Sequence, residues 1–143
     1  MRPADIQSSN PNLRGPQGVR DQRIRKSVEV LSRSELGQVI CLDQLAASLN
    51  LSGSRFRHLF KNEVGVSPQR YVRILRLRRA RNLLEESFLR VKEVMHMVGY
   101  SNPSHFVRDY KNFFSATPSI TRTCAWLARE PHSTAGAAKA GNK

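Results

Sequence analysis

The chain has 143 residues, and 24 Lys and Arg against 11 Asp and Glu give it a formal net charge of +13. This length suits a single domain, and so basic a balance indicates a polyanionic partner, nucleic acid first and an anionic membrane surface second. No apolar stretch approaches the roughly 18 residues of a spanning helix, and no apolar signal segment follows the start. A membrane-spanning or secreted protein is therefore not expected.

The first 19 residues contain several Pro, Gly, Ser and Asn, a composition typical of a flexible arm. A first helix is predicted after this arm, because Ile24, Val28 and Leu31 recur at i, i+4 and i+7. Cys41 then leads a short apolar helix, and we expect it to be a small buried hydrophobe.

The middle of the chain contains one pattern twice, and a repeat of this length indicates one supersecondary unit used two times. Each copy has a Phe, an aromatic residue four positions later, Lys-Asn directly after it and then Ser-Pro or Thr-Pro, at a constant offset of 50 residues. A short helical pattern and a turn precede each copy. The two units are predicted over about 42–64 and 91–114, and a helix over about 68–86 joins them.

A short helix, a tight turn and a second helix with a buried aromatic residue form a helix-turn-helix unit. The polar face of the second helix fits the major groove of B-DNA, where Arg bridges O6 and N7 of guanine. The joining helix would be about 30 Å long, close to the roughly 34 Å of one turn of B-DNA. One chain is therefore expected to place its two units in successive major grooves.

Residues 21–122 resemble the DNA-binding domain of the AraC/XylS family of bacterial transcription regulators. The motifs that carry the resemblance are Leu45-Ala46 through Phe60-Lys61, Gly65-Val66-Ser67-Pro68 with Tyr71, Leu77-Arg78-Arg79-Ala80-Arg81 and Gly99-Tyr100-Ser101-Asn102-Pro103-Ser104-His105-Phe106. The resemblance implies an all-α domain over 20–122, with about seven helices and two helix-turn-helix units that recognise DNA at promoters.

The expected DNA site combines the family's base-reading positions with the donors of the basic helices. Base contacts are expected from Ser54, Arg57, His58, Ser104, Val107 and Arg108. Contacts to DNA phosphates are expected from Ser52, Lys61, Arg78, Asn102 and Lys111. Phosphate contacts would position the duplex, whereas base contacts would read its sequence.

Four positions depart from the family pattern. Met95 stands where a small residue lets two helices approach closely, Ser115 stands where Gly is usual, and Thr121 replaces a common aromatic residue. Asp109 replaces an apolar residue beside the expected DNA face. There its carboxylate would either order Arg108 or repel phosphate.

The sequence favours a sequence-specific transcription regulator, and a sequence-neutral nucleic-acid-binding or architectural protein is the alternative. No Gly-rich phosphate loop, nucleophile motif or cofactor fingerprint occurs, so we expect neither an enzyme with catalytic residues nor a cofactor. The histidines and the two cysteines lack metal-ligand spacing, so no metal is expected.

Double-stranded promoter DNA is the expected partner, with RNA polymerase as a further candidate, on the nucleoid in the cytoplasm. Neither a membrane partner nor a small-molecule effector site is expected. The 20 residues before the first helix are too few for an effector or dimerisation domain. The sequence thus predicts either a small constitutive regulator or a piece of a longer one. A low-complexity tail is predicted over 123–143.

Overall fold

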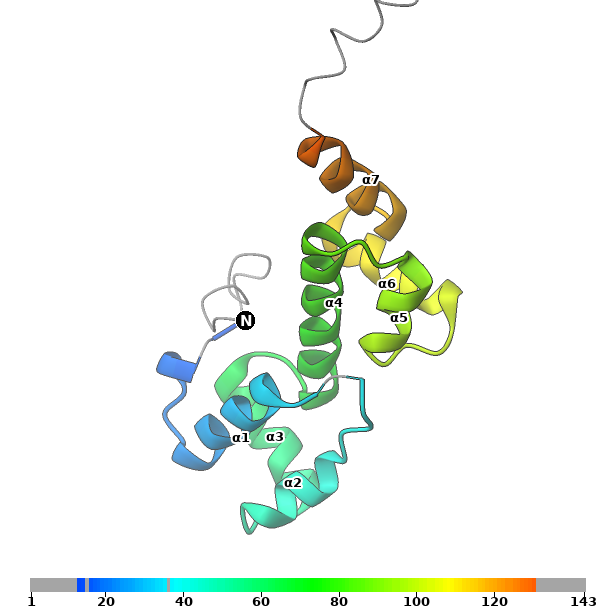
Figure 1. Ribbon diagram of the computed structural model, residues 1–143. Coiled ribbons are helices and arrows are strands. Elements are labelled where there is room, and N and C mark those ends of the chain that lie inside the picture. The colour runs from blue at the N-terminus through cyan, green and yellow to red at the C-terminus, as the bar shows by residue number, and fades with distance from the viewer. Residues whose placement is uncertain (1–12, 15, 36, 131–143) are drawn as a thin grey trace, which may run out of the picture.

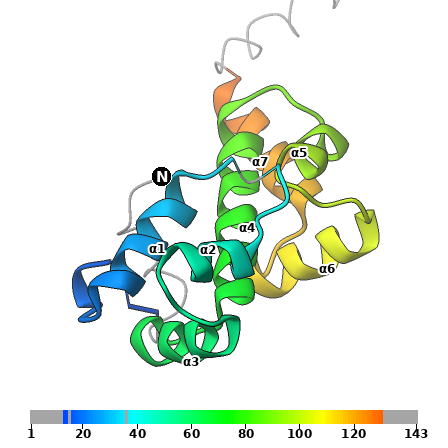
Figure 2. The same ribbon diagram turned by 90° about the horizontal axis from the view of Figure 1, so that it is seen from below.

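One long helix, α4, forms the centre of the fold, and other α-helices pack around it in the computed structural model (Figure 1 and Figure 2). The structure describes residues 13–130 apart from residues 15 and 36. In chain order its helices are η2 (Pro16–Gly18, a 3-10 helix), α1 (Gln22–Arg33), α2 (Leu42–Ser48), α3 (Gly53–Val64), α4 (Pro68–Glu86), α5 (Val91–Met97), α6 (Pro103–Phe114) and α7 (Pro118–Arg129). No strand occurs in this described part of the chain, and the predicted all-α class is confirmed.

Four helices of the two copies begin at corresponding positions that carry a side-chain cap. Ser52 and Asn102 cap α3 and α6, and in both cases a side-chain oxygen accepts from a backbone N–H of the first turn. Ser67 and Thr117 cap α4 and α7 in the same way. Pro follows the cap in α4, α6 and α7, at a position whose N–H has no helical acceptor. Local sequence therefore decides where these helices begin.

The backbone conformation repeats as well as the sequence. The described residues with a left-handed φ are Asn50 (57°), Gly65 (97°), Gly99 (87°) and Ser115 (58°). Asn50 and Gly99 lie in the turns after α2 and α5, whereas Gly65 and Ser115 end α3 and α6. Ser115 thus adopts a conformation that Gly adopts in the first copy, at a cost of roughly 1–2 kcal/mol for an L-residue.

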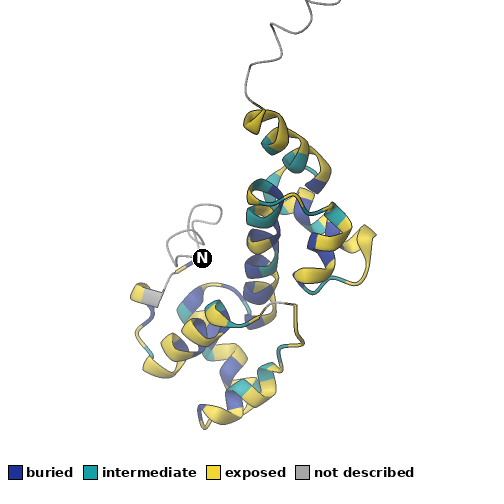
Figure 3. Cartoon of the chain, viewed as in Figure 1, coloured by how far each residue is buried: buried dark blue, intermediate teal, exposed yellow. Residues whose placement is uncertain are grey.

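Two hydrophobic cores share α4, one along each half of the helix. Figure 3 shows the buried residues along this helix. Buried residues between 71 and 75 pack with α1, α2 and α3, and buried residues between 77 and 84 pack with α5 and α6. Phe113 of α6 is partly buried and packs against both cores. The first unit (α2 and α3) and the second unit (α5 and α6) are therefore each fixed to their own half of α4.

The second core accommodates two of the departures from the family pattern. Met95 is 2% exposed at the position that Ala46, at 0%, holds in the first copy. Its flexible thioether side chain suits irregular space between helices. Thr121 accepts a hydrogen bond from the Tyr110 hydroxyl at 3.0 Å, so it satisfies the polar end of a buried ring.

The flexible arm predicted over residues 1–19 is wrong for its last part. Leu13 and Val19 are 3% and 1% exposed and belong to the first core. The backbone N–H of Arg14 donates to the carbonyl of Val64 at 2.9 Å. Isolated apolar residues among Pro and Gly have no helical periodicity, so only the tertiary contact reveals them. The rest of the predicted arm lies outside the described residues.

The predicted tail over 123–143 starts too early, because α7 continues to Arg129. The guanidinium of Arg129 donates to the carbonyl of Glu85 and lies 5.7 Å from the centroid of the Phe88 ring. These contacts join the last turn of α7 to the end of α4. The remainder of the predicted tail lies beyond the residues that the structure describes.

Cys41 is exposed, contrary to the burial expected for it. It is the N-cap of α2 and therefore precedes the helical face that enters the core. The apolar pattern begins one residue later, at Leu42, which packs against the first core. Cys124 of α7 is exposed as well.

We expect Leu13→Ala to lower the free energy of unfolding by about 2–5 kcal/mol, because the substitution empties a buried site. Urea unfolding followed by circular dichroism measures this change. Val39→Ala is the control, since Val39 is 96% exposed and its truncation should stay within about 0.5 kcal/mol of wild type. Equal midpoints for both variants would show that Leu13 does not belong to the core.

Candidate nucleic-acid interface

The outer faces of α3 and α6 carry the side chains predicted to contact bases. All six are exposed: Ser54, Arg57, His58, Ser104, Val107 and Arg108. Each of these recognition helices buries an aromatic pair in its own core, at positions 56 and 60 in α3 and at positions 106 and 110 in α6. An amphipathic helix buried in this way presents its opposite, polar face to solvent.

Arg57 is held by a carboxylate that the sequence alone does not single out. Its Nη2 lies 2.9 Å from Oδ1 of Asp43, which stands in the first turn of α2. The side chains are 51% and 69% exposed, so the pair contributes at most about 1 kcal/mol to stability. No periodic pattern links residues 14 apart across a turn, and the packing of α2 on α3 brings them together.

The second recognition helix presents its predicted contacts around one depression in the surface. The depression is lined by Pro103, Ser104, Val107, Arg108, Lys111 and Asn112. Val107, 38% exposed, stands at the position that Arg57 occupies in the first copy. Its side chain offers apolar contact, for example to a thymine methyl group, and no hydrogen bond. The two recognition faces therefore differ in chemistry.

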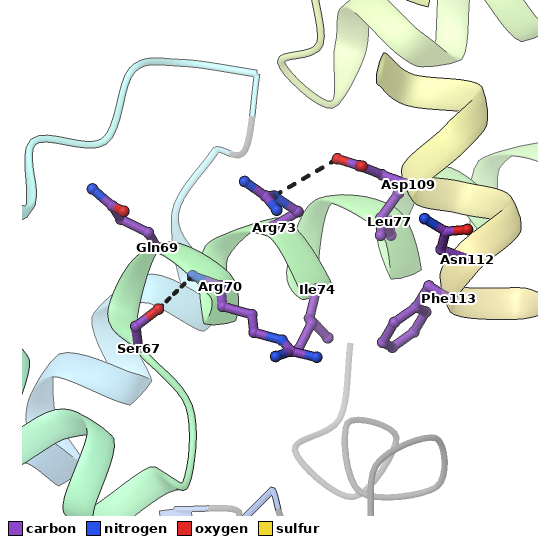
Figure 4. A pocket seen from close by; sticks show the side chains of 9 residues that line it. All are labelled: Ser67, Gln69, Arg70, Arg73, Ile74, Leu77, Asp109, Asn112 and Phe113. Atoms are coloured by element: carbon purple, nitrogen blue, oxygen red, sulfur yellow. Dashed lines mark hydrogen bonds and ion pairs between the residues drawn. The ribbon is translucent and has the colours of Figure 1, made fainter. Parts of the chain in front are cut away.

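Asp109 joins the second recognition helix to α4 across a groove of about 340 Å³ (Figure 4). Its Oδ2 lies 3.7 Å from Nε of Arg73 and accepts a hydrogen bond from the Tyr100 hydroxyl at 3.2 Å. Its Oδ1 lies 3.6 Å from Nε of Arg108. The carboxylate is 15% exposed, so it lies beside the outer face and is placed to order Arg108.

The first copy has an apolar pair where the second copy has this polar contact. Leu51 and Leu59 occupy the positions of Tyr100 and Asp109. Burial, and then the negative charge of Asp109, raise the pKa of the Tyr100 hydroxyl above its ordinary value. Tyr100 therefore stays protonated at neutral pH and acts as a hydrogen-bond donor to the carboxylate.

Four of the five predicted phosphate contacts are exposed. Lys61 and Lys111 lie in the last turns of α3 and α6, at matching positions. Ser52 and Asn102 stand at the N-termini of the same helices, where their side chains act as caps. Backbone N–H groups and the helix dipole make such a terminus favourable for a phosphate.

Arg78 is the exception, because it is only 8% exposed. Its guanidinium lies 5.7 Å from the centroid of the Phe113 ring, where the two cores meet. Positions 71, 74, 75 and 78 of α4 follow the spacing i, i+3, i+4, i+7, so Arg78 belongs to the buried stripe of the helix. The predicted phosphate contact at Arg78 is corrected accordingly, and exposed Arg70 and Arg73 carry positive charge on the same helix.

The outer faces of α3 and α6 carry guanidinium, ammonium, hydroxyl and imidazole groups, which are hydrogen-bond donors suited to phosphates and base edges, beside the apolar side chain of Val107. Within residues 13–130, as far as they are described, no cluster of three His, Cys, Asp or Glu side chains could hold a metal ion. The described helices include none that is both long and apolar enough to span a membrane.

Comparisons with known proteins agree with this arrangement. A helix-turn-helix domain family matches residues 45–123, more than half of the chain. The transcriptional regulator GbdR of Pseudomonas aeruginosa is 33% identical over 97 residues, which cover 68% of this chain and 26% of GbdR. A transcriptional regulator from Chromobacterium violaceum with an AraC-type DNA-binding domain is 27% identical, with a TM-score of 0.67 over 72% of this chain and 91% of that one. The DNA-binding domain of AdpA, solved in complex with a target DNA, has the same fold, with 23% identity and a TM-score of 0.65 over 77% of this chain and 97% of that one.

Two helix-turn-helix units on one joining helix, each with an exposed polar face, define a double helix-turn-helix DNA-binding domain. The chain belongs to the AraC-type family of helix-turn-helix transcription regulators, as its sequence resemblance implies. It spans about a quarter of the length of GbdR (26%).

Tyr100→Phe should make the protein less sensitive to alkaline pH. Because the folded-state pKa of Tyr100 is raised, above about pH 10 the unfolded chain releases this proton more readily than the folded chain, and stability falls. Phe has no proton to lose. Urea unfolding between about pH 9 and pH 11 should therefore show a smaller loss of stability for the variant.

Near pH 7 the same variant should be about 1.5 kcal/mol less stable than wild type, because the hydrogen bond to Asp109 is missing. Tyr71 and Tyr110, whose pKa values burial also raises, are present in both proteins and serve as the internal reference. Parallel pH profiles for the two proteins would contradict the assigned role of Tyr100.

Proposed function

We propose that the chain binds promoter DNA in a sequence-specific manner, with α3 and α6 in successive major grooves on one face of the duplex. The observation that carries this proposal is the length and burial of α4. Its 19 residues span about 28 Å, and a core along each half holds one unit. One turn of B-DNA is roughly 34 Å, a distance that suits one recognition helix in each groove.

The two recognition helices are proposed to read different bases. Arg57 would bridge O6 and N7 of a guanine, flanked by hydrogen bonds from Ser54 and His58. In the second unit Arg108 would contact a guanine while Val107 meets a thymine methyl group. The exposure of these side chains supports this assignment, and the net charge of +13 supplies attraction to phosphates of any sequence.

RNA polymerase is the proposed second partner, and the nucleoid in the cytoplasm is the proposed location, because a regulator bound at a promoter acts where transcription starts. The complex of AdpA with its target DNA supports double-stranded DNA as a ligand of this fold. The expectation that this part of the chain binds no small-molecule effector stays a prediction.

Selection of bound sequences from a random duplex library, at about 150 mM salt, tests the proposal. We expect one enriched motif with two halves separated by about 10 base pairs, the helical repeat of DNA. A single enriched half would show that only one unit reads bases. The absence of any enriched motif would leave a sequence-neutral binder, for which salt alone governs affinity.

Spacing between the two halves of the selected motif provides a geometric test. Insertion of about 5 base pairs turns the second half to the opposite face of the duplex, beyond the reach of a rigid pair of units. We expect electrophoretic mobility shifts to show a loss of at least tenfold in affinity, approaching that of a single half-site. Retained affinity would show that the units move independently of α4.

Substitutions in α3 separate base reading from phosphate binding. Arg57→Ala should cost about 1–3 kcal/mol on the selected motif and relax the preference at one base pair. Lys61→Ala should weaken binding to all duplexes alike and lower the salt slope by about one unit. Fluorescence anisotropy over a salt series measures both effects. Identical behaviour of the two variants would refute the assigned orientation of α3 in the groove.

A further inference from the structure

We infer that Asp43 and Gly53 determine the specificity of the first unit: the carboxylate orients Arg57 for base reading, and the glycine leaves space for that carboxylate. The inference rests on the proposed function and adds two positioning residues to it. Neither residue is expected to touch a base. Their role is to act through the guanidinium of Arg57.

The contact joins two helices within the unit. Asp43 lies in the first turn of α2, and its Oδ1 accepts a hydrogen bond from Nη2 of Arg57 at 2.9 Å. Arg has five N–H donors, so one bond to a carboxylate leaves a pair of donors for O6 and N7 of a guanine. The guanidinium is thus oriented before DNA arrives while it keeps the capacity to read a base.

Gly53 is needed for space rather than for backbone conformation. A Cβ at this position would lie 2.5 Å from Oδ1 of Asp43 and 3.7 Å from Nη2 of Arg57. The glycines with a left-handed φ are Gly65 and Gly99 among the described residues, so Gly53 does not require this conformation. It is the first residue of α3, where Gly has a lower helix propensity than Ala.

The second copy provides an internal comparison, because all three positions differ together. Lys92, Pro103 and Val107 occupy the positions of Asp43, Gly53 and Arg57. Where the arginine is absent, the carboxylate and the open space are absent as well. The rest of the scaffold, including the helix cap and the buried aromatic residues, is kept in both copies. Asp43, Gly53 and Arg57 therefore form one cooperating set of residues, which only the first unit contains.

Two physical effects explain how this set of residues improves the discrimination of Arg57 between the correct base pair and other base pairs. A guanidinium already held in one orientation loses less conformational entropy when it binds a base. A carboxylate beside it also repels DNA phosphates and competes with them for the guanidinium, which weakens binding to duplexes that lack the correct base. Both effects increase the difference in binding affinity between the selected motif and random DNA.

The test compares base preference and random-duplex affinity for Asp43→Asn, Gly53→Ala and wild type. Asp43→Asn should reduce discrimination at the base pair read by Arg57 by about fivefold or more, and should raise affinity for random duplex. Gly53→Ala displaces the carboxylate but keeps its charge. It should reduce discrimination at the same base pair with little change in random-duplex affinity, and the fold should persist because Ala favours a helix.

Two further variants act as controls. Glu29→Gln changes the net charge by the same amount as Asp43→Asn, on the exposed surface of α1, and should leave base discrimination unchanged. In an Arg57→Ala background, Asp43→Asn should have no further effect on discrimination, because the two residues act as one unit. A merely structural role of Asp43 would instead lower affinity equally for every base.

If both Asp43→Asn and Gly53→Ala kept the wild-type discrimination at the base pair read by Arg57, this inference would be overturned and the proposed function would remain intact. An additive effect of Asp43→Asn in the Arg57→Ala background would overturn it as well. If wild type itself showed no preferred sequence, the proposed function would fail first. We expect both variants to lose discrimination selectively at the one base pair that Arg57 reads.

Discussion

The sharing of α4 by two hydrophobic cores is the constraint on which the rest of the structure depends. Nine of its 19 residues are buried, so neither half of the helix is available for independent movement. Interiors of this kind are closely packed and transmit position from one element to the next. The separation of the recognition helices is therefore governed by helix geometry rather than by a flexible linker, and Phe113, packed against both cores, strengthens this coupling.

Comparison of the two copies separates the features that a helix-turn-helix scaffold requires from those that a recognition face can vary. Both copies keep a capped recognition helix, a buried aromatic pair and left-handed residues at corresponding turns. They differ where side chains meet solvent or the neighbouring unit. Leu59 is replaced by Asp109, which contacts Arg73 of α4. Function on this fold accordingly resides in local sites, and each unit carries its own chemistry.

Much of the fold follows from the sequence because local signals are strong in both copies. Caps at Ser52 and Asn102 and the apolar spacing of the short helices locate the elements that the structure shows. The exposed faces of α3 and α6 follow from the same periodicity, and so does the burial of Arg78, which the arginine-rich composition of α4 obscures. Leu13 and Val19 carry no such signal, since their burial depends on distant partners.

The sequence by itself determined most of the helices, their order, the duplication and the side chains that α3 and α6 expose, since these depend on contacts between near neighbours in the chain. Only the tertiary structure decided which polar side chains meet. The pairs Asp43 with Arg57 and Asp109 with Arg73 join different helices. These pairs form only at particular helix crossing angles and rotamers, which side-chain packing sets. A sequence gives the sign of each charge, but only the packed structure shows which neighbour each charged side chain faces.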